Sequence, residues 1–349
     1  MSSLHINQNT VGPNQPIYII AEISANHNQN YDKAVEIINA AKIAGANAVK
    51  LQTYTPETIT LNSDKSYFQI SGTLWNGRSL YDLYGEAYTP WEWHSGLKKV
   101  ADNLGLDLFS SPFDLTAVDF LEKLDVPAYK IASFELVDIG LIQKVAHTGK
   151  PTIMSTGMAT LAEIDEAVHA FRRAGGTELA LLKCNSAYPA PPEEMNLLTI
   201  PNLAETFSVQ VGLSDHTLGI EVPIAAVALG ATIIEKHFTL SRADIGPDSA
   251  FSLEPHEFKT MVDAVRTIEK ALGTVSYGIT SKEAQSLVFR RSLFVVQDVK
   301  AGEVFTEDNV RSIRPAHGLH TRHLPEILGK HASRDIERGT PLSWELVGV

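Results

Sequence analysis

Short runs of hydrophobic residues recur along most of the chain, and each run stops at polar residues. The eight runs are IYIIAEIS (17–24), AVKLQT (48–53), LDLFSSP (106–112), AYKIAS (128–133), PTIMSTG (151–157), LALLKCNS (179–186), VQVGLSDH (209–216) and TIIEKHFT (232–239). Nearly continuous apolar runs of this length are typical of strands that are buried on both faces of a parallel sheet.

The segments between these runs place apolar residues at helical spacing. Examples are YDKAVEIINAAKIAGA, LTAVDFLEKL and LAEIDEAVHAFRRAGG, and several of the segments end at glycine, as helices often do. Eight strand–helix units predict an α/β fold, the (β/α)₈ TIM barrel. Functional residues of that fold lie at the carboxyl ends of the strands, so we expect the polar tails of the runs to meet at one mouth.

The pattern changes towards the end of the chain, where short strand-like pieces alternate with turns. The stretches DVKAGEVFTEDNV (298–310) and DIERGTPLSWELV (335–347) share the same frame of Asp, apolar residue, Gly and Val. This repeat predicts a small pseudo-symmetric β module in which each Gly forms a turn with positive φ. We therefore expect a barrel domain over 1–273, a linker over 274–285 and a second domain over 286–349.

The segment 54–105 is too long for one loop and one helix. It contains SGTLWNGRSLYDLYGEAYTPWEWH, which is rich in Trp and Tyr. Two interpretations stay open: a lid that shields the mouth from water, or a subdomain that packs on the side of the barrel.

Composition narrows the class of protein. Hydrophobic residues make up 44% and charged residues 20%, which is ordinary for a folded globular protein. The net charge of −12 and the lack of a Lys/Arg cluster argue against a nucleic-acid partner. The single cysteine, Cys184, excludes an intramolecular disulfide, and MSSLHINQNT has no signal-peptide pattern. No apolar run approaches a membrane span, so we expect a cytoplasmic protein without a membrane partner.

Two histidines, His216 and His237, end neighbouring predicted strands. Neutral imidazoles placed in this way can share a metal ion, with acids nearby at Asp215 and Asp248. Two ligands leave positions open for water and substrate, which favours a catalytic over a structural site. The alternative is a pair of core histidines bonded to backbone carbonyls.

Lys50 and Lys130 also end apolar strands, where an unpaired ammonium group is costly to bury. Four strand-end serines, Ser111, Ser133, Ser155 and Ser214, could donate hydrogen bonds to phosphate or carboxylate oxygens. Together they predict a cradle for an anion; the alternative is that the lysines pair with Glu22 or Glu135.

Glu22 and Glu135 are candidates for acid–base chemistry, because apolar surroundings raise the pKa of a carboxyl group. Sequence alone leaves catalysis and the counter-ion role equally open. Cys184 is interpreted as a buried thiol. The stretch HGLHTRH, which contains His317, His320 and His323, is interpreted as a solvated loop outside the barrel.

The motifs AEISANHN, VKLQT, SSPFD, YKIAS, STGM, VGLSDHT, EKHFT and GPDSAFS resemble the sialic acid synthase family, over essentially the whole chain. This family condenses phosphoenolpyruvate with an N-acetylated amino sugar. The C-terminal module resembles its antifreeze-like domain, a SAF domain of the β-clip type. Within the family, AEISANHN and the aromatic segment resemble the branch that forms pseudaminic acid from 2,4-diacetamido-2,4,6-trideoxy-L-altrose. The N-acetylneuraminate and legionaminate synthases are the alternatives.

The resemblance implies a role for each matching residue. His216 and His237 would hold a divalent ion, Mn²⁺ or Mg²⁺, and Glu22 and Glu135 would manage protons or sugar hydroxyls. Phosphoenolpyruvate would contact Lys50, Ser111, Lys130, Ser133, Ser155, Asn185, Ser186 and Ser214. The sugar would contact Gln52, Tyr188, Asp248 and Arg314. Ser186 stands where the family often has Asn, with Asn185 beside it. Arg314 would reach into the barrel of a partner subunit, which implies a domain-swapped homodimer.

Two rival functions remain. One is a pyruvate aldolase that forms a Schiff base on Lys183. The other is a non-catalytic protein that binds carbohydrate or ice through its C-terminal module. For the sugar substrate, the 6-methyl group calls for an apolar contact, and Trp75 and Trp91 of the aromatic segment could provide it.

Overall fold

The computed structural model describes residues 3–72, 75–244 and 246–348. Thr73 and Leu74 of the aromatic segment lie outside the described residues. The chain divides into two compact units, Met1–Gly273 and Thr274–Val349, so the expected linker 274–285 falls in the second unit.

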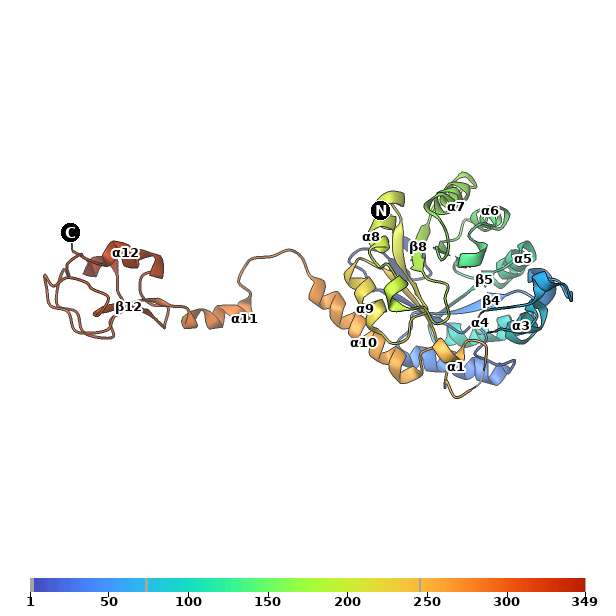
Figure 1. Cartoon of the computed structure of the whole chain (residues 1–349), viewed down its shortest axis with the longest axis horizontal. Coiled ribbons are helices and arrows are strands. Elements are labelled where there is room, and N and C mark those ends of the chain that lie inside the picture. The colour runs from blue at the N-terminus through green and yellow to red at the C-terminus, as the bar shows by residue number, and fades with distance from the viewer. Residues whose placement is uncertain (1–2, 73–74, 245, 349) are drawn as a thin grey trace. The chain divides into compact units, whose positions relative to one another are not determined.

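The first unit is a closed barrel of eight parallel strands ringed by helices (Figure 1). The strands are β3 (Tyr18–Glu22), β4 (Ala48–Thr53), β5 (Asp107–Pro112), β6 (Tyr129–Ile131), β7 (Thr152–Ser155), β8 (Leu179–Cys184), β9 (Gln210–Asp215) and β10 (Ile233–His237). They follow one another in chain order around the barrel, and β10 closes it against β3. Each strand lies within one of the eight predicted runs, so the predicted barrel is confirmed.

Several of the covering helices begin or end at residues that cap them. They are α1 (Tyr31–Ala44), α4 (His94–Asn103), α5 (Leu115–Leu124), α6 (Ile139–Ala146), α7 (Leu161–Arg173), α8 (Thr199–Phe207), α9 (Glu221–Ala228) and α10 (Pro255–Leu272). Asn30 caps α1 by accepting from the Lys33 amide, and Gly45 ends it at φ 93°. Thr160 and Glu163 form a capping box on α7.

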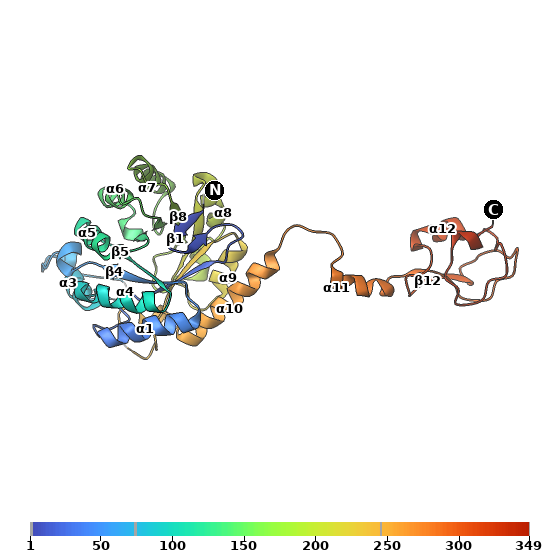
Figure 2. The ribbon, with the colours of Figure 1, turned by 180° about the vertical axis from the view of Figure 1, so that it is seen from behind.

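A hairpin that the sequence analysis did not predict precedes the barrel. Its strands are β1 (Leu4–Ile6) and β2 (Asn9–Val11), drawn in dark blue in Figure 2. Asp107, the first residue of β5, accepts hydrogen bonds from Asn7, Asn9 and the Tyr18 hydroxyl. The hairpin therefore lies at the amino ends of the strands, opposite to the expected mouth.

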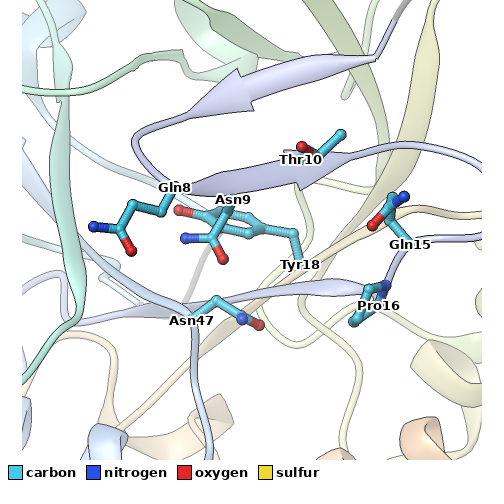
Figure 3. A pocket seen from close by; sticks show the side chains of 7 residues that line it. All are labelled: Gln8, Asn9, Thr10, Gln15, Pro16, Tyr18 and Asn47. Atoms are coloured by element: carbon cyan, nitrogen blue, oxygen red, sulfur yellow. The ribbon is translucent and has the colours of Figure 1, made fainter.

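A hollow of about 270 Å³ lies at this amino end. It is lined by Gln8, Asn9, Thr10, Gln15, Pro16, Tyr18 and Asn47, whose side chains Figure 3 shows. Its lining holds amides, a hydroxyl and a phenol but no carboxylate, lysine or histidine. Functional residues of this fold lie at the other end, so the hollow is not the candidate site.

The segment 54–105 folds into short helices before α4. These are α2 (Pro56–Ile59), η1 (Ser66–Phe68), α3 (Leu80–Ala87) and η2 (Trp91–Trp93). The loop after β3 anchors it: His27 Nε2 lies 3.1 Å from the Thr89 hydroxyl, and Gln29 donates to the Glu86 carbonyl at 3.1 Å. The segment is thus tied to the carboxyl end of the barrel.

The second unit is built from short elements around its own apolar core. They are α11 (Ser281–Ala284), η6 (Gln285–Phe289), β11 (Ser292–Val295), β12 (Val310–Ile313), η7 (Thr321–His323), α12 (Leu324–Ile327) and η8 (Trp344–Leu346). HGLHTRH lies here, with His317 and His320 exposed.

The predicted pseudo-symmetry of this unit is visible in its hydrogen bonds. Val299 and Ile336 occupy the same place in the two repeats and exchange backbone hydrogen bonds of 2.9 and 2.8 Å. Asp298 accepts from the Arg338 amide and Asp335 from the Ala301 amide, which are again equivalent positions. The two repeat glycines adopt φ 82° and 87°. The predicted positive-φ turns are therefore confirmed.

No helix in the described ranges is both long and apolar enough to cross a bilayer.

Candidate active site

Two imidazole rings lie together at the carboxyl ends of neighbouring strands. His216 directly follows β9, His237 ends β10, and these strands pair in parallel. Both side chains are buried, and their ring centroids are 5.2 Å apart. The predicted convergence of the two rings at one mouth is therefore confirmed.

The hydrogen bonding of the two rings suits a metal ion. His216 Nδ1 lies 2.8 Å from the Asn185 carbonyl, which holds the proton on Nδ1 and leaves a lone pair on Nε2. Nδ1 of His237 is buried and has no hydrogen-bond partner among the residues that the structure describes. Burial, with help from the charges of nearby lysines such as Lys50, holds the pKa of His237 well below its usual value. This ring is therefore neutral, as a metal ligand must be.

The two imidazoles are the protein ligands that this site can offer. Within residues 3–72, 75–244 and 246–348, no group of three or more His, Cys, Asp or Glu side chains could hold a metal ion. A divalent cation on two imidazoles would keep coordination positions for substrate oxygens. The donor set therefore fits a catalytic ion better than a structural one.

Beside the histidines, two lysines and two glutamates form a group that we name the mouth cluster: Glu22, Lys50, Lys130 and Glu235. Lys50 Nζ lies 2.8 Å from Glu22 Oε2. Glu235 Oε1 lies 3.7 Å from the ammonium nitrogens of both lysines. Burial lowers the pKa of Lys130, whereas the two glutamates outweigh burial and raise the pKa of Lys50.

The strand-end serines surround the mouth cluster. Lys50 Nζ donates to Ser111 Oγ at 3.3 Å, and Lys130 Nζ donates to Ser155 Oγ at 2.6 Å. Ser214 Oγ donates to Glu235 Oε1 at 3.0 Å. These ammonium and hydroxyl groups converge as the predicted anion cradle requires. The counter-ion alternative holds for Glu22, which pairs with Lys50, but among the described residues Glu135 forms no ion pair and Glu235 pairs with the lysines instead.

A glycine brings backbone close to two further serines. The Gly157 amide donates to Ser133 Oγ at 3.1 Å. A Cβ atom at Gly157 would lie 2.3 Å from Ser186 Oγ and 2.7 Å from Ser133 Oγ. A side chain at position 157 would displace both hydroxyls, so the glycine lets Ser133 and Ser186 keep these positions.

Glu22 and Glu135 have the environment of groups that exchange protons near neutral pH. Burial raises the pKa of each carboxyl group to about 7, and Glu235 contributes to the rise at Glu22. Oε2 of Glu135 is buried without a hydrogen-bond partner in the described part of the chain. Glu22 is held by Lys50 and by Gln52, whose Nε2 lies 3.1 Å from Glu22 Oε1.

A hydroxyl joins the predicted sugar ligands Gln52 and Asp248. Ser24 Oγ donates to the Asp248 carboxylate and accepts from Gln52 Nε2 at 2.9 Å. Burial raises the pKa of Asp248, although the Ser24 hydrogen bond opposes this. The network extends from Glu22 at the mouth cluster to the loop after β10.

Aromatic side chains enclose the histidine pair. Tyr188 lies 4.5 Å from His216 and 5.2 Å from Phe251, and Phe251 lies 4.9 Å from His237, all between ring centroids. Trp75 lies 5.7 Å from Tyr188 and donates its indole N–H to the Pro247 carbonyl at 3.2 Å. Segment 54–105 thus reaches the loops after β8 and β10, which favours the lid interpretation.

Trp91 has a different environment from Trp75. Its ring lies 4.7 Å from Phe120 on α5, and its indole N–H donates to the Tyr54 carbonyl at 3.1 Å. Trp91 therefore packs against the helix layer of the barrel.

Asp215, expected as an acid beside the metal, pairs elsewhere. Its carboxylate accepts from Lys236 Nζ and from the amide and hydroxyl of Thr217. Both members of this ion pair, which we name the wall pair, are fully buried. The expectation for Asp215 is wrong because successive strand residues face opposite sides, and Asp215 follows the mouth-facing Ser214.

Three other predicted residues lie as follows. Asn185 directs its side chain to Glu194 and the Ala187 amide, while its carbonyl accepts from His216. Arg314 belongs to the second unit, where it is exposed. Lys183 is half-buried and donates to the Cys184 carbonyl at 3.1 Å.

Cys184 is buried, as expected, and its sulfur lies 3.8 Å from His216 Nδ1. Burial acts to raise the pKa of its thiol, but His216, Ser133 and Lys130 outweigh this and lower it to about 7.

Sequence reasoning missed Glu235, Ser24 and Phe251. Glu235 lies two residues before His237, so strand alternation alone would have placed it on the mouth side. Ser24 ends the first run, and Phe251 lies in GPDSAFS, but neither residue type signals a role by itself.

The sequence matches two known families. Residues 37–277, more than half of the chain, match the NeuB family, and residues 290–347 match the SAF domain.

Known proteins extend the match over the whole chain. A pseudaminic acid synthase of Campylobacter jejuni subsp. jejuni is 50% identical over 326 residues, which cover 93% of this chain and 95% of the relative. A pseudaminic acid synthase of Helicobacter pylori is 49% identical, over 94% of this chain and 97% of the relative. The crystal structure of the spore coat polysaccharide biosynthesis protein spsE from Bacillus subtilis superposes with a TM-score of 0.68 at 33% identity. That alignment covers 100% of this chain and 99% of the other.

Proposed function

The chain belongs to the NeuB family, and we propose that it is a pseudaminic acid synthase. It condenses phosphoenolpyruvate with 2,4-diacetamido-2,4,6-trideoxy-L-altrose and water to give pseudaminic acid and phosphate. The observation that carries the proposal is the mouth itself: a two-lysine anion cradle beside a histidine pair, in a chain about half identical to two pseudaminic acid synthases along nearly its whole length. The reaction is expected in the cytoplasm.

The mouth cluster would bind the phosphate and carboxylate of phosphoenolpyruvate. An incoming anion would take over Lys50 and Lys130 from Glu235, which lies 3.7 Å from each ammonium nitrogen. Ser111, Ser133, Ser155, Ser186 and Ser214 would donate to the remaining oxygens. Charge-assisted hydrogen bonds of this kind position the enol carbon for attack.

His216 and His237 would hold Mn²⁺ or Mg²⁺, which when bound polarises the sugar aldehyde as a Lewis acid. C3 of phosphoenolpyruvate forms a bond to the aldehyde carbon, whose oxygen gains a proton. Water then adds at C2 and loses a proton, and phosphate leaves with cleavage of its C–O bond. Glu22 and Glu135, with pKa values raised to about 7, are the groups suited to hold and deliver these protons.

Phosphate release tests the reaction and its rivals together. The protein is mixed with phosphoenolpyruvate, Mn²⁺ and one of three sugars: the diacetamido-trideoxy-altrose, N-acetylmannosamine or the legionaminic acid precursor. We expect release with the first sugar and loss of release after chelation. A preference for either other sugar would reassign the acceptor, and no release with any sugar would favour a carbohydrate-binding protein.

The aldolase alternative makes the opposite prediction. If Lys183 formed a Schiff base, borohydride would trap a pyruvate adduct and chelation would leave activity intact. We expect no adduct. Lys183→Met separates the two functions further, because it would abolish aldolase activity but leave metal-dependent phosphate release.

We further propose that the enzyme is a homodimer in which Arg314 of the partner subunit completes each sugar site. Mixing two inactive variants, Lys50→Met and Arg314→Ala, tests this. A mixed dimer would hold one site with both wild-type residues, so activity should return to about a quarter of wild type. No recovery from verified mixed dimers would show that Arg314 acts within its own chain, and an active Arg314→Ala variant would show that it has no role in the site.

A further inference from the structure

Ser24 occupies an unusual backbone position at the mouth. It follows β3 by two residues, is 2% exposed and adopts φ 46°. Left-handed backbone is uncommon for residues other than glycine, and where it occurs in a buried loop it is often kept for a functional reason. A glycine would adopt this conformation without strain, so the serine side chain itself needs an explanation.

The hydroxyl of Ser24 links the two predicted sugar ligands of the barrel. It donates to the Asp248 carboxylate and accepts from Gln52 Nε2 at 2.9 Å. A hydroxyl has one hydrogen, and an ionised carboxylate can only accept, so the direction of both bonds is determined.

These bonds also determine which atom of Gln52 is left for a ligand. Gln52 Nε2 lies 3.1 Å from Glu22 Oε1 as well as 2.9 Å from Ser24 Oγ, which uses both amide hydrogens. The carbonyl oxygen of Gln52 therefore remains as an acceptor. Asp248, a carboxylate, is also an acceptor. Because both side chains bond to the Ser24 hydroxyl, the Gln52 carbonyl oxygen and the Asp248 carboxylate are held side by side as hydrogen-bond acceptors.

We propose that Ser24 is a positioning residue for the sugar, holding Gln52 and Asp248 as paired acceptors for N–H or O–H groups of the acetamido sugar. The inference rests on the proposed function and adds a determinant of acceptor specificity to it. Ser24 acts through its two partners and has no part in binding phosphoenolpyruvate. Without its hydroxyl, the Gln52 amide can rotate and Asp248 loses a donor that orients it.

Two substitutions separate the hydroxyl from the backbone. Ser24→Gly removes the hydroxyl and relieves the positive φ, whereas Ser24→Ala removes the hydroxyl and keeps the strain. The matched control is Ser208→Gly, because Ser208 is also a serine in left-handed conformation, at φ 55°, but is exposed at the end of α8.

We expect both Ser24 variants to raise the KM of the diacetamido sugar about tenfold, the loss typical of one hydrogen bond to a charged group. The KM of phosphoenolpyruvate should stay within about twofold, because Ser24 has no bond to the lysines. Ser208→Gly should change neither value. Thermal unfolding should show Ser24→Gly to be no less stable than Ser24→Ala.

The outcomes are distinct. An unchanged sugar KM in Ser24→Gly would overturn the inference. A rise of the sugar KM in Ser24→Ala alone would also overturn it, because that result would reflect backbone strain and not the lost hydroxyl. An equal rise in both KM values would also overturn it. Failure of the proposed function appears separately, as a wild-type protein that releases no phosphate with any acetamido sugar.

Discussion

The mouth cluster and the wall pair are two buried charge systems of the same barrel, which share only strand β10, and they differ in how completely their charges are paired. In the wall pair, Lys236 donates to Asp215 and to the Thr217 carbonyl, and Asp215 accepts two more bonds from Thr217. In the mouth cluster, Lys50 pairs with Glu22 at 2.8 Å, but Lys50 and Lys130 share one oxygen of Glu235 at 3.7 Å each. A closed network stabilises the barrel, whereas an open one can exchange its carboxylate for a substrate anion.

The largest expected effect comes from breaking the wall pair. Lys236→Met leaves the Asp215 carboxylate buried and unpaired, which should lower the free energy of unfolding by about 3–5 kcal/mol. Chemical denaturation measures this. The double variant Asp215→Asn, Lys236→Met is the control and should recover much of the loss. If the single variant is as stable as wild type, the wall pair is not a closed structural unit.

In the mouth cluster, we expect Lys50→Met to reduce activity more than it reduces stability. We expect kcat/KM for phosphoenolpyruvate to fall about a hundred- to a thousandfold, as when a donor to developing charge is removed. The loss of stability should be smaller than for Lys236→Met, because Glu22 can take up a proton and Glu235 keeps Lys130. A large stability loss without a kinetic effect would reverse the comparison.

A third test compares the two tryptophans. Trp75→Ala opens the segment over the mouth and should raise the sugar KM about tenfold through lost aromatic contact. Trp91→Ala should instead lower the melting temperature, because Trp91 packs on Phe120. Steady-state kinetics and thermal unfolding of both variants are the measurements. Equal kinetic losses in the two variants would mean that the segment does not act as a lid at Trp75.

The smallest effect is a pH dependence of stability at the mouth. Burial raises the pKa of Glu135 from 4.5 to about 7, so the folded chain holds this proton where the unfolded chain has released it. Its contribution to stability is complete below pH 4.5 and is lost as the pH rises through 7. Glu135→Gln should flatten the melting temperature between pH 5 and 8 relative to wild type.

Glu163 gives the control with the opposite sign. Hydrogen bonds from Thr160 lower its pKa, so the stability it contributes is present above pH 4.5 and is lost on acidification. Glu163→Gln should leave the slope between pH 5 and 8 as in wild type. If Glu135→Gln also leaves this slope unchanged, the Glu135 carboxyl group is solvated and the prediction is wrong.

Much of the fold was predictable because the barrel strands are buried on both faces and are therefore apolar at almost every position. The histidine pair and the lysines followed from their positions at strand ends. The hairpin β1–β2 was not predictable in this way, because it is too short to show a period. Asp215 was misassigned because adjacent residues on one strand face opposite sides, and it neighbours the mouth-facing Ser214. Glu235 was missed although the same alternation, counted back from His237, places it on the mouth side.

The sequence by itself determined the eight strands, their order of appearance, the repeat in the second unit and the residue types at each strand end. These properties are local, since they depend on hydrophobic periodicity and on turn residues. Only the tertiary structure decided which charges meet. It set Lys236 against Asp215 in the wall, placed Glu235 between two lysines, and joined Ser24 to Asp248 across more than two hundred residues. Such pairings depend on barrel closure, which brings strands together in space irrespective of their separation along the chain.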